Sequence, residues 1–369
     1  MELLSQIALS MTPGLGPTSC RKLLELYPDQ DIFALPPSEI KTAFGSHHAI
    51  AEAILGRTAF PRAEEELRFC ERNKIRVLFC TDEAFPQRLN REETQDCPVL
   101  LYVKGDLDLN PERAVSVVGT RRATPQGRDV TDRLVSQMVP LATPIVSGLA
   151  YGIDTAAHTA ALAHGLPTVA VLGHGLDRIY PPANRRLAIE ILEKGGALVT
   201  EYPNGTAINP GYFPARNRII AALSDATVVV EASEKGGALI TAAIASGYHR
   251  EVFAVPGRVA DKYAAGTNNL IASHRALLIR DADDLAYQMG WPLSVRQAAD
   301  APQQTLFATL NKEEQQVMDL LHNHQQLTLE ELASMTGMPM PRIAALMFNL
   351  EMQKAVRVLP GRLYQPLLS

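Results

Sequence analysis

The sequence predicts an α/β protein whose central part is a doubly wound parallel sheet. Two observations support this fold class. Short apolar runs recur through the middle of the chain, and helix-like stretches separate most of them. Glycines and polar residues follow several of these runs, as they do at the carboxyl ends of parallel strands. A small helical domain before the sheet and a winged-helix-like domain after it complete the predicted architecture.

Nine apolar runs are predicted to be strands. A polar connector separates the first two, 75–79 and 99–103, whereas the later seven alternate with helical stretches. Because connections between parallel strands are right-handed, helices should cover both faces of the sheet. Residues 74–290 are therefore expected to form one extended Rossmann-like domain. The later runs are 115–118, 145–146, 168–172, 197–200, 227–230, 252–255 and 277–279.

Residues 1–73 are predicted to form short helices, in the manner of a helix–hairpin–helix or SAM-like domain. Gly14 and Gly16 bracket one apolar residue between two helical stretches. Two interpretations stay open for this turn. The backbone N–H groups at the following helix start could accept a DNA phosphate, or the turn could simply join two helices without a ligand.

A stretch rich in Gln, Ala, Pro and Asp over 291–305 is predicted to be a linker, and residues 306–369 a winged-helix-like domain. Asn311 with Glu314, and Thr328 with Glu331, are capping-box pairs that should start two helices. A third helix and a hairpin follow. The domain holds five Lys or Arg against six Asp or Glu. This balance favours protein contact or weak binding over duplex recognition, which usually needs a basic face.

Composition excludes several classes of protein. The chain has 369 residues and a net charge of −5, so any positive surface for nucleic acid must be local. No uninterrupted apolar run approaches the ~20 residues of a membrane span. The four cysteines lie far apart without a C-x-x-C pair, which favours free thiols in the cytoplasm. No metal-ligand spacing or cofactor fingerprint is present, so neither a metal nor a cofactor is expected.

Basic residues and glycine-bearing turns gather after the predicted strands. Arg121 and Arg122 follow the first strand of the regular series, and Phe213 precedes a helix start that carries Arg216 and Arg218. Aromatic rings beside basic groups are typical of single-strand binders, because bases stack on the rings while the basic groups track the backbone. The alternative for Phe213 is a purely structural role at the helix start.

A catalytic triad of Ser147, Asp154 and His158 is disfavoured, because Ser147 does not stand in G-x-S-x-G. We therefore predict no catalytic residue.

Several ordered stretches together resemble the DNA-processing protein A family, also called Smf or DprA. The resemblance spans the 114–280 region. The matching stretches are Val117-Val-Gly-Thr-Arg-Arg122, Ser147-Gly-Leu-Ala-Tyr-Gly-Ile-Asp154, Val171-Leu-Gly-His-Gly-Leu-Asp-Arg-Ile-Tyr-Pro181, Phe213-Pro-Ala-Arg-Asn-Arg-Ile-Ile220, Val229-Val-Glu-Ala232 with Gly237-Ala-Leu-Ile-Thr241, and Val252-Phe-Ala-Val-Pro-Gly257.

This resemblance implies a cytoplasmic, non-enzymatic protein of natural transformation. It would bind and protect incoming single-stranded DNA, help load the RecA recombinase and form a homodimer. Two positions depart from the family: Asn209-Pro210 stands where a basic residue often occurs, and Tyr151 replaces a frequent basic residue with a ring that could stack. The implied strand-binding residues are Gly119, Thr120, Arg121, Arg122, Ser147, Gly148, Phe213, Arg216, Asn217, Arg218, Lys235, Gly236 and Gly237.

An enzyme is the alternative function. Nucleotide-hydrolysing Rossmann proteins of the lysine-decarboxylase-like group also place two glycines before a helix, but a catalytic Glu follows in their motif. The stretch from Gly236 to Ala243 offers no Glu. A scaffold with a vestigial pocket is a third alternative, and any strand binding would separate it from the first.

Overall fold

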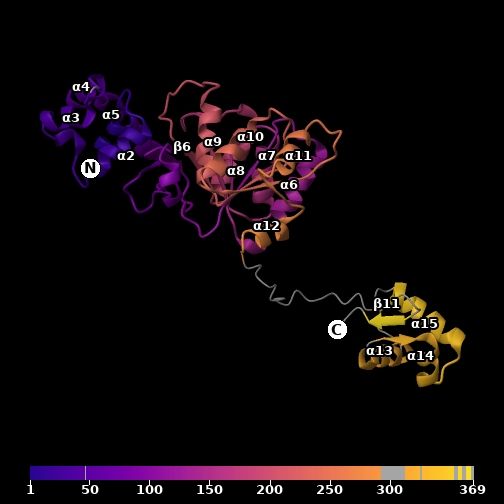
Figure 1. Cartoon of the computed structure of the whole chain (residues 1–369). Helices are drawn as coiled ribbons and strands as arrows, with labels where there is room; N and C mark the ends of the chain where they lie inside the picture. The colour runs from indigo at the N-terminus through magenta and orange to yellow at the C-terminus, as the bar shows by residue number, and fades with distance from the viewer. Residues whose placement is uncertain (46, 292–311, 325, 353–355, 360–362, 367–369) are drawn as a thin grey trace. The chain divides into compact units, whose positions relative to one another are not determined.

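The computed structural model describes residues 1–45, 47–291, 312–324, 326–352, 356–359 and 363–366 (Figure 1). The chain divides into two compact units, Met1–Val295 and Arg296–Ser369. The predicted linker beyond Trp291 and the predicted cap Asn311 lie outside the described residues. Within the described ranges, no helix has the length and apolar character that crossing a bilayer requires.

One nine-stranded sheet forms the centre of the first unit, with the order β1-β2-β6-β5-β4-β3-β7-β8-β9. Strand β2 runs antiparallel to β1 and to β6, and every other neighbouring pair is parallel. Each of the nine predicted runs contains a strand, so the predicted sheet is confirmed. The strands are β1 Arg76–Phe79, β2 Leu100–Lys104, β3 Val115–Val118, β4 Ile145–Ser147, β5 Thr168–Val171, β6 Ala197–Thr200, β7 Ala226–Val229, β8 Glu251–Ala254 and β9 Leu277–Leu278.

Helices cover both faces of this sheet, because alternate strand residues point to opposite sides. Val115 and Val117 share a core with helices α6, α7 and α12, whereas Val118 joins the core beneath α9, α10 and α11. The result is a three-layer arrangement with the sheet in the middle. The helices around the sheet are α6 Pro125–Gln137, α7 Ile153–Ala163, α8 Arg185–Glu193, α9 Tyr212–Ala222, α10 Gly237–Gly247, α11 Ala265–Ala272 and α12 Ala282–Gln288.

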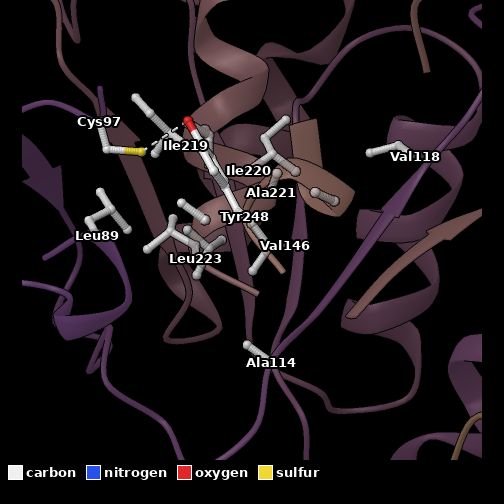
Figure 2. Packing of buried hydrophobic residues seen from close by; sticks show 14 of the residues in the cluster. Leu89, Cys97, Ala114, Val118, Val146, Ile219, Ile220, Ala221, Leu223 and Tyr248 are labelled. Carbon is white, nitrogen blue, oxygen red and sulfur yellow. Dashed lines mark hydrogen bonds between the residues drawn. The ribbon is translucent and has the colours of Figure 1, made fainter. Parts of the chain in front are cut away.

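Tyr248 closes the core under α9 and α10 (Figure 2). Its ring lies among buried aliphatic side chains such as Leu223 and Val146. Its hydroxyl lies 3.7 Å from the Cys97 sulfur and donates to an Asp96 carboxylate oxygen at 2.6 Å. A buried hydroxyl needs such a partner, since an unsatisfied one costs about 1–3 kcal/mol. The loop before β2 is thereby fastened to the end of α10.

Five short helices precede the sheet and pack on its antiparallel end. Phe79 of β1 and Leu100 and Tyr102 of β2 are buried in the same core as these helices. Gly14, in the turn between the first two helices, has φ +80°, which glycine adopts without strain. These helices are α1 Leu3–Ser10, α2 Pro17–Leu26, α3 Pro37–Phe44, α4 His48–Leu55 and α5 Phe60–Asn73.

The second unit has the predicted winged-helix pattern. A reciprocal capping box joins Thr328 and Glu331 at the start of its second helix, as the sequence indicated. Gly337 ends that helix in the left-handed conformation. A three-stranded sheet of order β10-β12-β11 completes the unit. The elements are α13 Lys312–His324, β10 Leu327–Thr328, α14 Leu329–Thr336, α15 Met340–Met352, β11 Val356–Leu359 and β12 Leu363–Pro366.

Candidate nucleic-acid interface

The carboxyl end of β3 is the point where the sheet's winding reverses. From β3 the chain passes to β4, β5 and β6 on one side, and it returns to β7 on the other side. Such switch points leave a crevice beyond the strand ends, where ligands of doubly wound sheets bind. The Thr120 N–H donates to the Glu231 carbonyl at 2.7 Å and ties the β3 and β7 turns together. A Cβ at Gly119 would lie 2.5 Å from Ile153 Cγ1, so glycine is required there.

A cleft of about 700 Å³ occupies this crevice. The turns after several strands and the first turns of α9 and α10 form its walls. Nine of the thirteen residues predicted from the resemblance line it, namely Gly119, Thr120, Arg121, Arg122, Phe213, Arg216, Asn217, Gly236 and Gly237.

Two arginines of the cleft are free to bind a ligand. The side chains of Arg121 and Arg122 are exposed, and neither has an ion-pair or hydrogen-bond partner within the described residues. The Arg121 guanidinium carbon lies 5.8 Å from the centroid of the Phe213 ring. A guanidinium offers five N–H donors in a planar fork that matches phosphate. The cleft therefore presents uncommitted positive charge beside an aromatic face.

Phe213 and Tyr180 form an aromatic pair in the same cleft. Their ring centroids are 5.5 Å apart with an interplanar angle of 37°. Tyr180 is 41% exposed, whereas Phe213 is half-buried and rests against Gly173. A ring held on one side and open on the other suits stacking of a base. Phe213 also packs at the start of α9, so its position is compatible with stacking and with the structural role alike.

Arg216 lies beneath the cleft floor with only 3% of its surface exposed. Its Nη1 donates to the Gly148 carbonyl at 2.7 Å and to the Val171 carbonyl. Burial lowers the pKa of Arg216 to about 10, with Arg121 acting in the same direction and Asp154 against it. Burial raises the pKa of Asp154, and the nearby Arg216 charge opposes that rise. Arg216 is therefore placed to hold the β4 and β5 turns together.

The remaining predicted residues lie beside or behind the cleft. Arg218 is paired with Glu201 through both guanidinium Nη atoms, at 2.5 and 2.6 Å. Ser147 is buried and donates to the Val117 carbonyl at 2.7 Å. Gly148 leaves room for the Arg216 side chain, since a Cβ at position 148 would collide with the guanidinium. Lys235 is exposed on the neighbouring surface of α10 and does not line the cleft.

No Ser–His–Asp triad is assembled at this edge. The His158 Nδ1 lies 2.7 Å from the Thr168 hydroxyl, and Ser147 is bonded elsewhere. Burial lowers the pKa of His158 to about 3, so its imidazole is neutral at physiological pH. Helix α10 carries no carboxylate after Gly237. In the part of the chain that the structure describes, no group of three or more His, Cys, Asp or Glu side chains could hold a metal ion.

The family model for DNA recombination-mediator protein A matches residues 76–290, a range that contains every strand of the nine-stranded sheet. The chain belongs to this family. A second model, the DprA winged helix domain, matches residues 296–362. The resemblance inferred from the cleft motifs is thereby confirmed.

Relatives of this DprA-family chain cover most of its length. Protein Smf of Escherichia coli is 32% identical over 82% of this chain and 81% of its own. Protein Smf of Synechocystis is 35% identical over 78% of this chain and 73% of its own. DNA processing protein A of Streptococcus pneumoniae has a solved structure that superposes with a TM-score of 0.68, at 34% identity, over 77% of this chain and 97% of its own. DNA processing protein A of Helicobacter pylori, whose structure is described for its single-stranded DNA binding mode, superposes with a TM-score of 0.51, at 30% identity, over 58% of this chain and 95% of its own.

The cleft of this DprA-family protein includes residues that the sequence analysis missed. Tyr180, Lys262 and Tyr263 line it, together with Asp154. Lys262 and Tyr263 lie in the loop between β8 and α11. Applying the same carboxyl-end rule to β8 would have found them. Tyr180 belongs to the stretch 171–181 that resembles the family, but no pattern in the sequence predicts its contact with Phe213.

A buried carboxylate fastens the loop that leads to Phe213. Glu66 of α5 is 1% exposed and accepts the Asn204 backbone N–H at 3.0 Å and the Asn204 side-chain amide. It also pairs with Arg62 at 3.0 Å. Farther along this loop, Tyr202 and Tyr212 stack with ring centroids 4.5 Å apart. The helical region before the sheet therefore braces one wall of the cleft.

Proposed function

We propose that this protein binds single-stranded DNA in the cleft at the carboxyl ends of β3 and β7. One observation carries the proposal: the unpaired guanidinium of Arg121 stands beside the Phe213 ring, which pairs with Tyr180, and the unpaired Arg122 lines the same cleft. Phosphates of a single strand would bind the arginines, and bases would stack on the rings. The Gly236 N–H donates to the Ser233 carbonyl, so the N–H groups of Gly237 and Ala238 in the first turn of α10 would be the ones presented to a further phosphate.

We infer the role within the cell from family membership. We propose that the protein protects single strands taken up during natural transformation and helps to load the RecA recombinase, in the cytoplasm and without catalysis. The single-strand binding mode described for the Helicobacter pylori relative supports the first step. The Streptococcus pneumoniae relative has the same fold over 77% of this chain, and the E. coli relative is similar in sequence over 82% of it.

We further propose that the protein acts as a homodimer. Strand β9 forms one edge of the sheet, and its two leucines, Leu277 and Leu278, are 42% and 44% exposed. An edge strand with exposed apolar side chains is a suitable surface for pairing with a second chain. Sedimentation of the purified protein tests this, and a monomer at micromolar concentration would contradict it.

Fluorescence anisotropy with labelled oligonucleotides tests the main proposal. We expect the full chain to bind dT20 and to bind a duplex of the same length at least tenfold more weakly. A parallel assay for release of base or phosphate from nucleoside monophosphates distinguishes the enzyme alternative. Hydrolysis that copurifies with the protein and disappears in a Gly237→Trp variant, or equal affinity for both oligonucleotides, would overturn the proposal.

A further inference from the structure

A second basic surface begins where the cleft ends. Tyr180 lines the cleft, and Pro182, two residues later, lines a neighbouring hollow along helix α8. Arg185 and Arg186, the first residues of α8, line the same hollow and are exposed. The two concave surfaces are therefore joined through the segment between β5 and α8.

Hydrogen bonds from Asn184 hold the start of α8, which lines this hollow, against the loop that forms part of the cleft wall. The Asn184 amide donates to the Leu149 carbonyl at 2.8 Å and to the Thr155 hydroxyl at 2.9 Å. Ala150, next to Leu149, lines the cleft. The following residue, Tyr151, is 49% exposed. The exposed ring of Tyr151 therefore stands on the loop between β4 and α7, to which Asn184 ties the start of α8.

The charges around the hollow differ in whether they are already paired. Arg185 and Arg186 have no ion-pair or side-chain hydrogen-bond partner among the described residues, as with Arg121 and Arg122 in the cleft. By contrast, Arg178 is paired with Asp177 at 2.7 Å, and Lys194 with Glu190 at 3.1 Å. The acidic residues of the hollow stand in the later part of α8. The free positive charge therefore lies at the end of the helix nearest the cleft.

We propose that a single strand leaving the cleft passes Tyr151 and binds Arg185 and Arg186 through its phosphates. This rests on the proposed binding in the cleft and extends it to a longer strand. The hydrogen bond from Asn184 to the Leu149 carbonyl joins the segment that carries the two exposed arginines to the loop that carries the exposed ring of Tyr151, so arginines and a ring occur together here as in the cleft. Rings and basic groups in alternation are how single strands are tracked without regard to sequence.

Oligonucleotide length tests this extension. A dT6 strand can fill the cleft only, whereas dT20 can also reach α8. Each phosphate contact to a single strand adds about −0.7 to the slope of log K against log salt, or roughly fivefold in affinity between 1 M and 0.1 M salt. The double change Arg185→Ala with Arg186→Ala should therefore weaken dT20 binding about 25-fold at 0.1 M salt and flatten its slope by about 1.4. Binding of dT6 should stay within twofold of wild type.

Two further double variants make the test specific. Arg185→Lys with Arg186→Lys keeps both charges and should keep the dT20 slope. Arg72→Ala with Arg133→Ala is the matched control. These two exposed arginines lie near the C-terminal ends of α5 and α6, on the side of the sheet where strands β1 and β4 begin. Removing the same amount of charge there should leave dT20 binding unchanged. Tyr151→Ala should weaken dT20 at least fivefold without changing the slope, whereas Tyr151→Phe should bind normally.

The outcomes separate the two proposals. Equal dT20 affinity and slope for wild type and the Arg185→Ala, Arg186→Ala variant would overturn the extension while leaving the cleft intact. An equal loss for dT6 and dT20 in a variant with an unchanged melting temperature would also overturn it, because the arginines would then serve the cleft itself. Failure of wild type to bind either oligonucleotide would instead refute the proposed function.

Discussion

Replacing Arg216 by methionine should destabilise the first unit without removing a phosphate contact. The side chain is 3% exposed, and its Nη1 donates to the carbonyls of Gly148 and Val171. Methionine has a similar length and fills much of the same volume but donates no hydrogen bond. Each unsatisfied buried carbonyl costs about 1–3 kcal/mol. Breaking a buried charged group's interactions costs about 3–5 kcal/mol in total.

We therefore expect the free energy of unfolding to fall by about 3–5 kcal/mol, which lowers the melting temperature by roughly 6–20 °C at about 2–4 °C per kcal/mol. Arg121→Met is the matched control, because the same change is made at an exposed side chain. Its effect should stay within about 0.5 kcal/mol. Urea denaturation of the two variants and wild type measures the difference.

The loss should also depend on pH through Asp154. Burial raises the pKa of Asp154, and the Arg216 charge opposes that rise. A carboxyl whose folded pKa is raised contributes stability below its unfolded pKa, and this is lost as pH rises through the folded pKa. Without Arg216 the folded pKa rises further, so the stability deficit of Arg216→Met should be larger at pH 8 than at pH 5. A deficit below about 1 kcal/mol, or one that grows toward acid pH, would refute this account of Arg216.

Other predictions concern binding and the braced wall. Arg121→Ala should flatten the salt slope of dT20 binding by about 0.7. Phe213→Ala should weaken binding by roughly 1–3 kcal/mol and leave the slope unchanged. Melting curves must show that both variants are folded, and equal slopes for Arg121→Ala and wild type would remove that arginine from the site. Deleting residues 306–369 should change dT20 affinity by less than tenfold, because that region is charge-balanced. A larger loss measured by anisotropy would contradict this. Glu66→Gln should lower the melting temperature and weaken dT20 binding severalfold by loosening the loop around Asn204, and an unchanged affinity at 25 °C would show that the brace does not matter for the cleft.

The sheet could be predicted from the sequence because its strands are short, apolar and separated by helices. The central strands β3 to β7 are buried on both faces, and such strands leave apolar runs that can be recognised in the sequence alone. Strand β9 was also predicted, although both of its leucines are exposed. The antiparallel direction of β2 was not predicted. The connector between β1 and β2 holds two short 3-10 helices and no α-helix, which a parallel crossover usually needs. The winged-helix pattern was predictable from local capping signals such as Thr328 with Glu331.

The candidate site was predictable by position but not by the state of each side chain. Arg121, Arg216 and Arg218 look equivalent in the sequence, each being an arginine after a strand or at a helix start. In the fold, Arg121 is exposed, Arg216 is buried under the cleft and Arg218 is paired with Glu201. These differences depend on which carbonyls and carboxylates the neighbouring strands bring within reach. Only tertiary structure supplies that information.

The core shared between the first five helices and the antiparallel end of the sheet limits how this protein could be recombined with others. A chain starting at residue 74 would expose Phe79, Leu100 and Tyr102, which the helices otherwise bury. It would also leave Asn204 without the carboxylate that holds its loop. Gene fusions or exchanges of modules that cut between helix α5 and strand β1 should therefore produce insoluble products. Exchanges between related proteins should therefore keep helices α1 to α5 together with the sheet, whichever domain follows residue 291.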